Sequence, residues 1–366
     1  MPTVVIAPDG FGGTLSAPQA AEAIAAGWRT VRPADELILV PMSDGGEGLL
    51  DAVERTGDTR HTTEVAGPLG HPVNAAMLVR RDGSVLIESA LACGLALVPP
   101  ERRDPSLTTT YGVGQLLEAA RTLGTRRILV GLGGSSTVDG GAGALIALGF
   151  RPTVEDGSGL KIGAADLDRV TALSADRRAD WSDIEVELLA DVATPLTEAA
   201  QVFGPQKGAS PEQVEELRHA LGRWADVVER DLVPGGAPPR PLRELPATGA
   251  AGGLGYALVA ALDARFRRGS QAVGELVGLP AAIAAADLVV TGEGRLDATT
   301  SAGKVVTHVA DCARARGVPV HAVVGQCGSG APGLDDVQEA SPTGPPVDPA
   351  AEVRVAAGRS ASVWTP

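Results

Sequence analysis

The sequence predicts an α/β fold: a Rossmann-like parallel sheet domain with a second, mixed α+β domain inserted into it. The chain has 366 residues, enough for two domains or for one domain with a large insertion. Hydrophobic residues make up 44% of it and aromatic residues only 3%, so Ala, Val, Leu and Ile must fill the core, as they do where helices pack on parallel strands. Short aliphatic runs also recur, each ending in a small or acidic loop. This rhythm is typical of strands buried on both faces.

Five such runs are the expected strands. They cover residues 3–7, 37–40, 127–131, 288–291 and 320–324, and they lead into PDGFGG, PMSDGGEG, LGGSSTVDGGAG, GEGRLD and GQCGSG. In an open parallel sheet the carboxyl ends of the strands share one edge, and ligands bind beside that edge. We therefore expect the five loops to meet there.

Helices are expected between the strands. Ser16 is a candidate N-cap with Gln19 three residues later, and helical spacing of apolar residues follows. Further helices are expected over about 112–123, 140–148, 211–230 and 303–315.

The remaining segments indicate the second domain. Asp82-Gly83 predicts a hairpin within residues 65–98, and residues 233–255 are rich in Pro and Gly and read as a linker. The tail from Ala331 is expected to be loosely ordered, at least in part. The expected boundaries are 1–62, 105–150 and 281–366 for the Rossmann-like domain, and 63–104 and 151–280 for the mixed α+β domain.

Charge and cysteine content narrow the class of protein. The formal charge of −14 and the lack of a basic cluster with aromatics disfavour a nucleic-acid partner. The three cysteines form no CxxC pair and keep no metal-ligand spacing. No run of about 18 apolar residues or export signal is found. We expect a cytoplasmic protein with a small-molecule substrate and no membrane partner, and a homodimer stays open.

The loop after residues 127–131 is the best candidate for binding phosphate. Gly133, Gly134, Ser135 and Ser136 follow a strand and precede a helix, where unhindered backbone and helix N–H groups favour an anion. The motif is neither a P-loop nor a full GxGxxG. A tight βα turn with no ligand is the other interpretation.

Acidic residues gather in the same loops. Candidates are Asp9, Asp44, Glu47, Asp139, Asp191, Glu293 and Asp297. Carboxylates beside a polyphosphate suggest Mg²⁺ bridging and a general base, which phosphoryl transfer requires, and so point to a kinase-like reaction. Helix capping or a solvated turn is the alternative for each of them.

Basic residues near the loops are few. Lys207, Arg295 and Lys304 are candidates to hold a transferring phosphate or a substrate carboxylate. Lys304 stands at an expected helix start, where a positive charge is unfavourable, although a surface lysine is the alternative.

Read together, the motifs resemble a known family. APDGFGGTLSA, PMSDGGEG, GLGGSSTVDGGAG, FGPQKGAS, GAAGGLG and TGEGRLDATTSAGK occur in the order and at the spacing of the bacterial glycerate kinase family, which is unrelated to P-loop kinases. The resemblance spans residues 3–327, about nine tenths of the chain. It implies a two-domain α/β enzyme that moves the γ-phosphoryl group of Mg·ATP to D-glycerate, usually giving 2-phosphoglycerate, with the substrates in a cleft between the domains.

The resemblance also implies roles for single residues. Asp191, Glu293, Arg295 and Asp297 match catalytic positions, and Asp191 and Glu293 are the implied metal ligands. Gly133, Gly134, Ser135, Ser136 and Lys304 are the implied phosphate-binding and nucleotide-binding residues. Asp9, Phe11, Asp44 and Lys207 are the implied substrate-binding residues.

The first loop departs from the family pattern. APDSFKGSLSA is usual there, whereas this chain has Gly10 in place of the serine and Gly12 in place of the lysine. Glycine cannot replace a charge that contacts phosphate or carboxylate. Three interpretations follow: a glycerate kinase that tolerates the change, a relative acting on another small hydroxylated molecule, and a ligand-binding protein that has lost catalysis.

Overall fold

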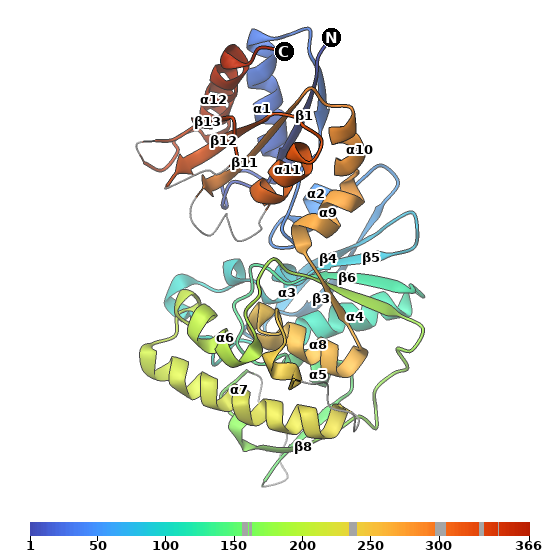
Figure 1. Cartoon of the computed structure of the whole chain (residues 1–366). Coiled ribbons are helices and arrows are strands. Elements are labelled where there is room, and N and C mark those ends of the chain that lie inside the picture. Colours follow the sequence, from blue (N-terminus) through green and yellow to red (C-terminus); the bar gives the residue numbers. More distant parts are fainter. Residues whose placement is uncertain (156–159, 161–162, 234–239, 297–304, 329–332, 343) are drawn as a thin grey trace. The chain divides into compact units, whose positions relative to one another are not determined.

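The computed structural model describes the chain except for residues 156–159, 161–162, 234–239, 297–304, 329–332 and 343. The chain forms two compact units. Unit 1 comprises residues 1–44, 48–54 and 268–366, and unit 2 comprises 45–47 and 55–267. Unit 2 is thus an insertion within the sequence of unit 1, and both units are mixed α/β (Figure 1).

Unit 1 is built on a five-stranded parallel sheet with the strand order β13-β12-β11-β1-β2. The strands are β1 (Thr3–Pro8), β2 (Glu36–Leu39), β11 (Leu288–Leu296), β12 (Val320–Cys327) and β13 (Asp336–Glu339). Its helices are α1 (Ala17–Val31), α2 (Leu49–Val53), α9 (Gly269–Val277), α10 (Leu279–Ala284), α11 (Val305–Arg314) and α12 (Pro349–Val363). The parallel α/β fold predicted from the sequence is confirmed here.

Helices cover both faces of this sheet. Helix α1 begins at the predicted capping box, in which Gln19 N donates to Ser16 Oγ at 3.4 Å and Ser16 N donates to the Gln19 side chain at 2.9 Å. Its apolar face packs with α12 over Val4 and Ile6 of β1. On the other face Val306 of α11 packs on Ala322 of β12. Alternate strand residues therefore enter two separate apolar layers.

Unit 2 is built on a six-stranded mixed sheet with the strand order β10-β9-β6-β5-β4-β3. Strands β3 and β4, and β4 and β5, pair antiparallel, and the others pair parallel. The strands are β3 (Thr59–Ala66), β4 (Pro72–Val79), β5 (Val85–Glu88), β6 (Arg127–Gly131), β9 (Glu185–Leu189) and β10 (Arg265–Arg267), and β7 (Arg151–Val154) and β8 (Val170–Ser174) form a separate pair. The predicted hairpin is the β4–β5 pair.

The helices of unit 2 include a long amphipathic one, α7, which begins with a second capping box at Ser210. The α-helices are α3 (Ala90–Cys93), α4 (Tyr111–Thr122), α5 (Ala142–Ala147), α6 (Leu196–Phe203), α7 (Pro211–Leu232) and α8 (Leu254–Leu262). The 3₁₀ helices are η1 (Leu95–Leu97), η2 (Pro100–Arg102), η3 (Leu167–Arg169), η4 (Pro205–Lys207), η5 (Leu242–Glu244) and η6 (Ala250–Gly253).

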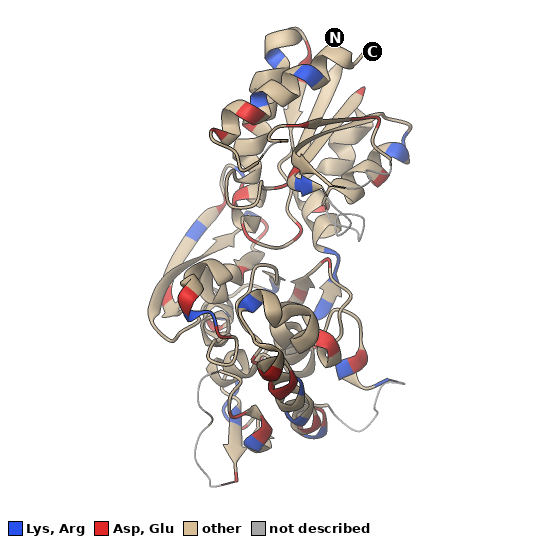
Figure 2. Cartoon of the chain, turned by 90° about the vertical axis from the view of Figure 1, so that its left-hand side faces the viewer, with Lys and Arg blue, Asp and Glu red and all other residues tan. Residues whose placement is uncertain are grey.

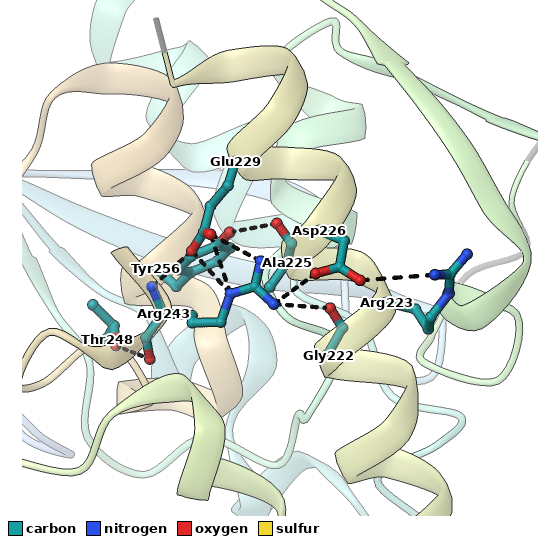
Figure 3. A network of polar contacts seen from close by, with 8 residues as sticks. All are labelled: Gly222, Arg223, Ala225, Asp226, Glu229, Arg243, Thr248 and Tyr256. Carbon is teal, nitrogen blue, oxygen red and sulfur yellow. Dashed lines mark hydrogen bonds and ion pairs between the residues drawn. The ribbon is translucent and has the colours of Figure 1, made fainter. Parts of the chain in front are cut away.

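Most of the expected linker over residues 233–255 is structured. Arg243 of η5 pairs with Glu229 and Asp226 of α7, each at 2.8 Å, and donates to Gly222 O (Figure 3). Thr248, which is fully buried, donates its hydroxyl proton to Leu245 O at 2.7 Å. Because these contacts and the buried residues of η6 join the core of unit 2, residues 240–255 are part of the unit.

The tail beyond Ala331 is also structured rather than loosely ordered over most of its length. It supplies the edge strand β13 and helix α12, whose buried residues Val353, Ala356 and Ala357 pack on α1. The two helices cross closely because Gly27 carries no side chain: a Cβ there would lie 2.1 Å from Arg354 O. Backbone approach of this kind needs glycine.

The domain boundaries expected from the sequence differ from the boundaries of the two units. Residues 105–150, expected in the Rossmann-like domain, lie in unit 2, because β6 pairs with β5 and β9 rather than with β1 or β11. Residues 268–280, expected in the second domain, lie in unit 1. The five expected loops therefore belong to the edges of two sheets, one in each unit.

Charged residues of both signs are spread along the chain. Lys and Arg positions are interspersed with Asp and Glu positions in each unit (Figure 2). Among the helices of the described residues, none is both long and apolar enough to cross a membrane.

Candidate active site

In unit 1 a pocket of about 500 Å³ lies at the carboxyl ends of the parallel strands. The loop after β1 contributes Phe11 and Gly12, and the end of β11 contributes Glu293 and Arg295. Further lining residues are Gly10, Thr14, Gly294, Gly325, Gln326, Ala340, Ser341, Pro345, Pro346, Pro349 and Val353. The pocket therefore combines one charged side with an apolar wall, at the sheet edge where α/β proteins bind ligands.

The loop after β1 is held tightly although it is rich in glycine. Asp9 N donates to Gly292 O at 2.9 Å, which joins the loop to β11, and Phe11 N donates to Leu15 O at 2.8 Å. Gly12 has φ +47°, a left-handed conformation, and a Cβ there would meet no atom within 4 Å. Position 12 is thus open toward the pocket and favours glycine only through its backbone.

Glycines at the ends of β11 and β12 bring three chain segments together. A Cβ on Gly294 would lie 3.0 Å from the main-chain carbon of Phe11, and a Cβ on Gly325 would lie 2.3 Å from Gly294 O. This close approach holds the first loop against the strand that carries Glu293, which is half-buried, and Arg295, which is exposed. A carboxylate and a guanidinium two residues apart on one strand can serve anion binding and proton or metal chemistry.

Most of the apolar wall of the pocket comes from the segment before α12 and from the first turns of α12. Glu352 accepts hydrogen bonds from Val347 N at 2.8 Å and from Asp348 N at 3.3 Å, and its other oxygen accepts the Ser341 hydroxyl proton. Gln326 Nε2 donates to Gly344 O at 3.1 Å. These bonds fix the prolines of the wall. The motifs in the sequence did not indicate them as site residues, and the Pro345-Pro346 pair shortly before the helix N-cap is the one local signal of them.

In unit 2 the loop after β6 joins several strands and helices. Gly133 N donates to Gly45 O at 3.3 Å, and Ser136 N and Oγ both donate to Cys93 O, at 2.8 and 2.9 Å. A Cβ on Gly133 would lie 2.4 Å from Gly46 Cα. Two of the four main-chain donors predicted to bind phosphate therefore bind protein carbonyls, and the phosphate prediction now depends mainly on Gly134 and Ser135.

The start of α5 is occupied by a carboxylate. Asp139 is fully buried and accepts from Gly141 N at 3.0 Å, from Gly143 N at 3.2 Å and from Thr110 N at 2.8 Å. Burial raises the pKa of this carboxyl, and the hydrogen bonds oppose that shift. Asp139 therefore caps the helix from within the core, which is the alternative considered for it above.

Lys207 lies inside unit 2, with only 4% of its surface exposed. Its ammonium donates to Ser135 Oγ at 2.9 Å and to Thr137 O at 2.7 Å, and Nζ lies 5.6 Å from the centre of the Phe203 ring. Burial lowers its pKa to about 8. The buried thiol of Cys93 nearby has a pKa raised to about 12 by desolvation, in keeping with a core cysteine.

The other predicted residues divide between the units. Asp191 follows β9 and lies beside the β6 loop, since Leu132 N donates to Leu189 O. Asp9 and Asp44 belong to unit 1. The next three residues, Gly45–Glu47, belong to unit 2, where they contact the loop after β6. Asp297 and Lys304 lie outside the described residues.

Glycine-rich loops after parallel strands, at the edge of the parallel sheet of unit 1 and of the mixed sheet of unit 2, with carboxylates beside them, are typical of α/β enzymes that act on small molecules. The sequence profile of the Glycerate kinase family matches residues 4–356. The chain is 40% identical to the glycerate kinase of Halalkalibacterium halodurans over 338 residues (90% of this chain and 87% of the relative), and 38% identical to the glycerate 2-kinase of Escherichia coli K12 over 331 residues (88% and 84%). A crystal structure from Salmonella typhimurium LT2, assigned to glycerate kinase 2, matches with a TM-score of 0.83 and 39% identity, covering 98% of this chain and 97% of that one.

This chain belongs to the glycerate kinase family. It is a kinase-like phosphotransferase, as the resemblance of its motifs implied.

Proposed function

We propose that this protein transfers the γ-phosphoryl group of ATP to a hydroxyl group of D-glycerate and yields 2-phosphoglycerate. The observation that carries the proposal is the unit 1 pocket, which brings Glu293 and Arg295 to the glycine loop after β1 in a member of the glycerate kinase family. The relatives named above support glycerate as the acceptor.

The residues of the pocket suit a hydroxy acid. The Arg295 guanidinium can bind a carboxylate or a phosphate oxygen through two parallel N–H groups. Glu293, on the same strand, is the candidate to accept the proton of the attacking hydroxyl. Asp9 and Phe11 hold the loop that forms the opposite side of this pocket. Within unit 2, Gly134 and Ser135 are candidate donors to a phosphate group.

Mg²⁺ fits the donor set in each unit. No group of three or more His, Cys, Asp or Glu side chains gathers as a metal cluster in the described part of the chain. Mg²⁺ commonly takes one or two carboxylates together with waters and substrate phosphates, which is the kind of ligand that Asp191 and Glu293 supply. When bound, the ion would neutralise phosphate charge.

The first experiment measures ADP formation from Mg·ATP with and without D-glycerate and resolves the product by phosphorus NMR. Glycerate-dependent formation of 2-phosphoglycerate at an ordinary kinase rate is expected. The proposal fails if a folded sample binds nucleotide without glycerate-stimulated turnover. Glu293→Gln and Arg295→Met should each lower kcat/KM, and Arg218→Met, at an exposed position of α7, is the control for loss of a cation.

A second acceptor is favoured by the size and lining of the pocket. A three-carbon acid fills only a small part of about 500 Å³, and Phe11, Pro346 and Val353 offer apolar contact that glycerate does not use. A larger hydroxy acid with an apolar substituent fits this wall. A panel of 2-hydroxy acids of increasing length, compared by kcat/KM, distinguishes the two acceptors.

A cytoplasmic setting is proposed because the thiols suit it. Cys93, Cys312 and Cys327 are all free, as expected in a reducing cytoplasm. Light scattering of the purified protein decides whether it is a homodimer, which the sequence leaves open.

A further inference from the structure

Lys207 carries a charge in a place where a charge is costly. Its side chain is buried, and its ammonium donates to two acceptors that are both uncharged: the Ser135 hydroxyl and the Thr137 carbonyl. Taking an ammonium out of water costs free energy that two neutral acceptors repay only in part. A buried methionine of similar length would avoid this cost, so packing alone does not explain a lysine here.

The hydrogen-bond chemistry of the pair fixes the direction of the serine proton. An ammonium has three donors and no acceptor, so Ser135 Oγ must accept from Lys207. The serine proton must then point away from Lys207, and in the described part of unit 2 no acceptor is found for it. Ser135 is 8% exposed and lies in the loop that follows β6.

The second hydrogen bond of Lys207 fixes the backbone two residues after Ser135. Thr137 O accepts from Nζ, and the Thr137 hydroxyl donates to Ala251 O at 3.3 Å. Ser136 is anchored between them through Cys93 O. The loop is thus bound on both sides of Ser135, and the hydroxyl of Ser135 is the group that remains to serve a ligand.

We propose that Lys207 is a positioning residue, whose ammonium turns the Ser135 hydroxyl so that its proton is donated outward to an oxygen of a bound phosphate group. This inference rests on the proposed function, since it takes the loop after β6 as the phosphate site. It replaces the role implied by the family resemblance, in which Lys207 contacts the substrate itself. The positive charge also polarises the serine O–H and strengthens the bond that it donates.

The protonation of Lys207 gives the arrangement a dependence on pH. Its pKa of about 8 means that the ammonium becomes an amine in mildly alkaline solution, and an amine can accept the serine proton and turn it inward. The titratable groups facing Lys207 are Cys93 and Asp139, and the Arg103 main chain packs on the adjacent Gly208. The Cys93 pKa of about 12 keeps this thiol neutral through that pH range.

The test measures binding of inorganic tripolyphosphate to the full chain by calorimetry. Lys207→Met and Ser135→Ala should each weaken binding about tenfold, the effect of losing one hydrogen bond to a charged group. The double variant should bind no more weakly than either single variant, because the lysine acts through the serine. Arg218→Met and Ser84→Ala are the matched controls, a surface cation and a buried serine of the β4–β5 turn.

A second measurement serves if Lys207→Met fails to fold. The ratio of wild-type to Ser135→Ala affinity cancels the titration of the probe, and this ratio should fall toward one as the pH rises through about 8. Multiplicative losses in the double variant, a flat ratio, or no tripolyphosphate binding by the wild-type protein would each overturn the proposal. Binding with this coupling but without glycerate-dependent ADP formation would leave Lys207 in its role and reject the proposed function.

Discussion

The carboxylate of Asp139 accepts hydrogen bonds from both the main-chain N–H of Thr110, at 2.8 Å, and its hydroxyl group, at 2.9 Å. The same carboxylate accepts from Gly141 N and Gly143 N at the start of α5. Asp139 therefore ties the start of α4 to the start of α5 inside the core. A group that the sequence places among ligand-binding carboxylates is thus a structural one.

Asp139→Asn should destabilise unit 2 by about 1–3 kcal/mol, because the amide nitrogen of asparagine would face N–H donors and leave them without an acceptor. Chemical denaturation checks this value, with the exposed Asp311→Asn as control. Burial raises the pKa of Asp139 in the folded protein, so folding favours the neutral acid. This contribution to stability is fully present below the unfolded pKa and is lost as the pH rises through the folded pKa. The difference in stability between wild type and variant should change over that window, and an unchanged midpoint would contradict the structural role.

Gly12→Lys should raise kcat/KM for D-glycerate, by up to the order of 10², the factor that one electrostatic contact to a transition state supplies. The position lines the pocket beside Glu293 and Arg295, and a side chain there meets open space. The left-handed φ of +47° should cost about 1 kcal/mol of stability.

Gly12→Ala is the matched control, because it carries the same backbone cost without the charge. If both variants leave kcat/KM unchanged, the pocket does not use a cation at position 12, and the larger acceptor becomes the better proposal. Steady-state ADP release with D-glycerate measures the effect.

Local signals in the sequence predicted much of the fold. The capping box at Ser16, the Asp82-Gly83 turn and the aliphatic strand runs depend on neighbours a few residues apart, and each appears in the structure. The distribution of strands between two sheets could not be predicted in this way, because β6 and β11 have the same local pattern. Which strand each one pairs with depends on contacts far apart in sequence.

The same limit applies to the candidate site. The motifs located Glu293, Arg295 and the loop after β1, which meet at one pocket. The motifs could not predict that Lys207 is buried. A lysine between glutamine and glycine is expected to be exposed unless its hydrogen-bond acceptors are known. The apolar wall was missed because it is formed by a tail whose composition resembles a disordered segment.

Gly252→Ala should destabilise unit 2 by about 3 kcal/mol. Gly252 has φ +64°, and a Cβ there would lie 1.9 Å from Thr137 O, in the loop that Lys207 also binds. Gly222→Ala is the opposite case: it lies within α7 with nothing within 4 Å, so it should stabilise the protein by about 1 kcal/mol. Thermal and chemical denaturation of the pair measure both signs, and a harmless Gly252→Ala would mean that the segment does not support the loop.

Trp364→Ala should destabilise unit 1 by about 3 kcal/mol, because the ring is buried between two helices. Its centroid lies 5.8 Å from that of Trp28, and Arg32 Cζ lies 4.6 Å above it. Arg32 also pairs with Asp35 at 2.6 Å, and Asp35 accepts the Trp28 indole N–H at 3.0 Å. Removing the ring therefore opens one side of a connected cluster at the end of α12.

The consequence should reach the pocket, since α12 also supplies Val353 to its wall and packs along α1. Trp364→Ala is expected to raise KM for the acceptor as well as to lower the midpoint of unfolding, whereas Trp364→Phe keeps an aromatic contact and should show smaller effects of the same sign. Val363→Ala, the exposed neighbouring residue, should change stability by less than about 0.5 kcal/mol. A Trp364→Ala protein with wild-type stability would mean that the tail does not hold α12 on unit 1, and wild-type KM with reduced stability would separate the helix from the pocket.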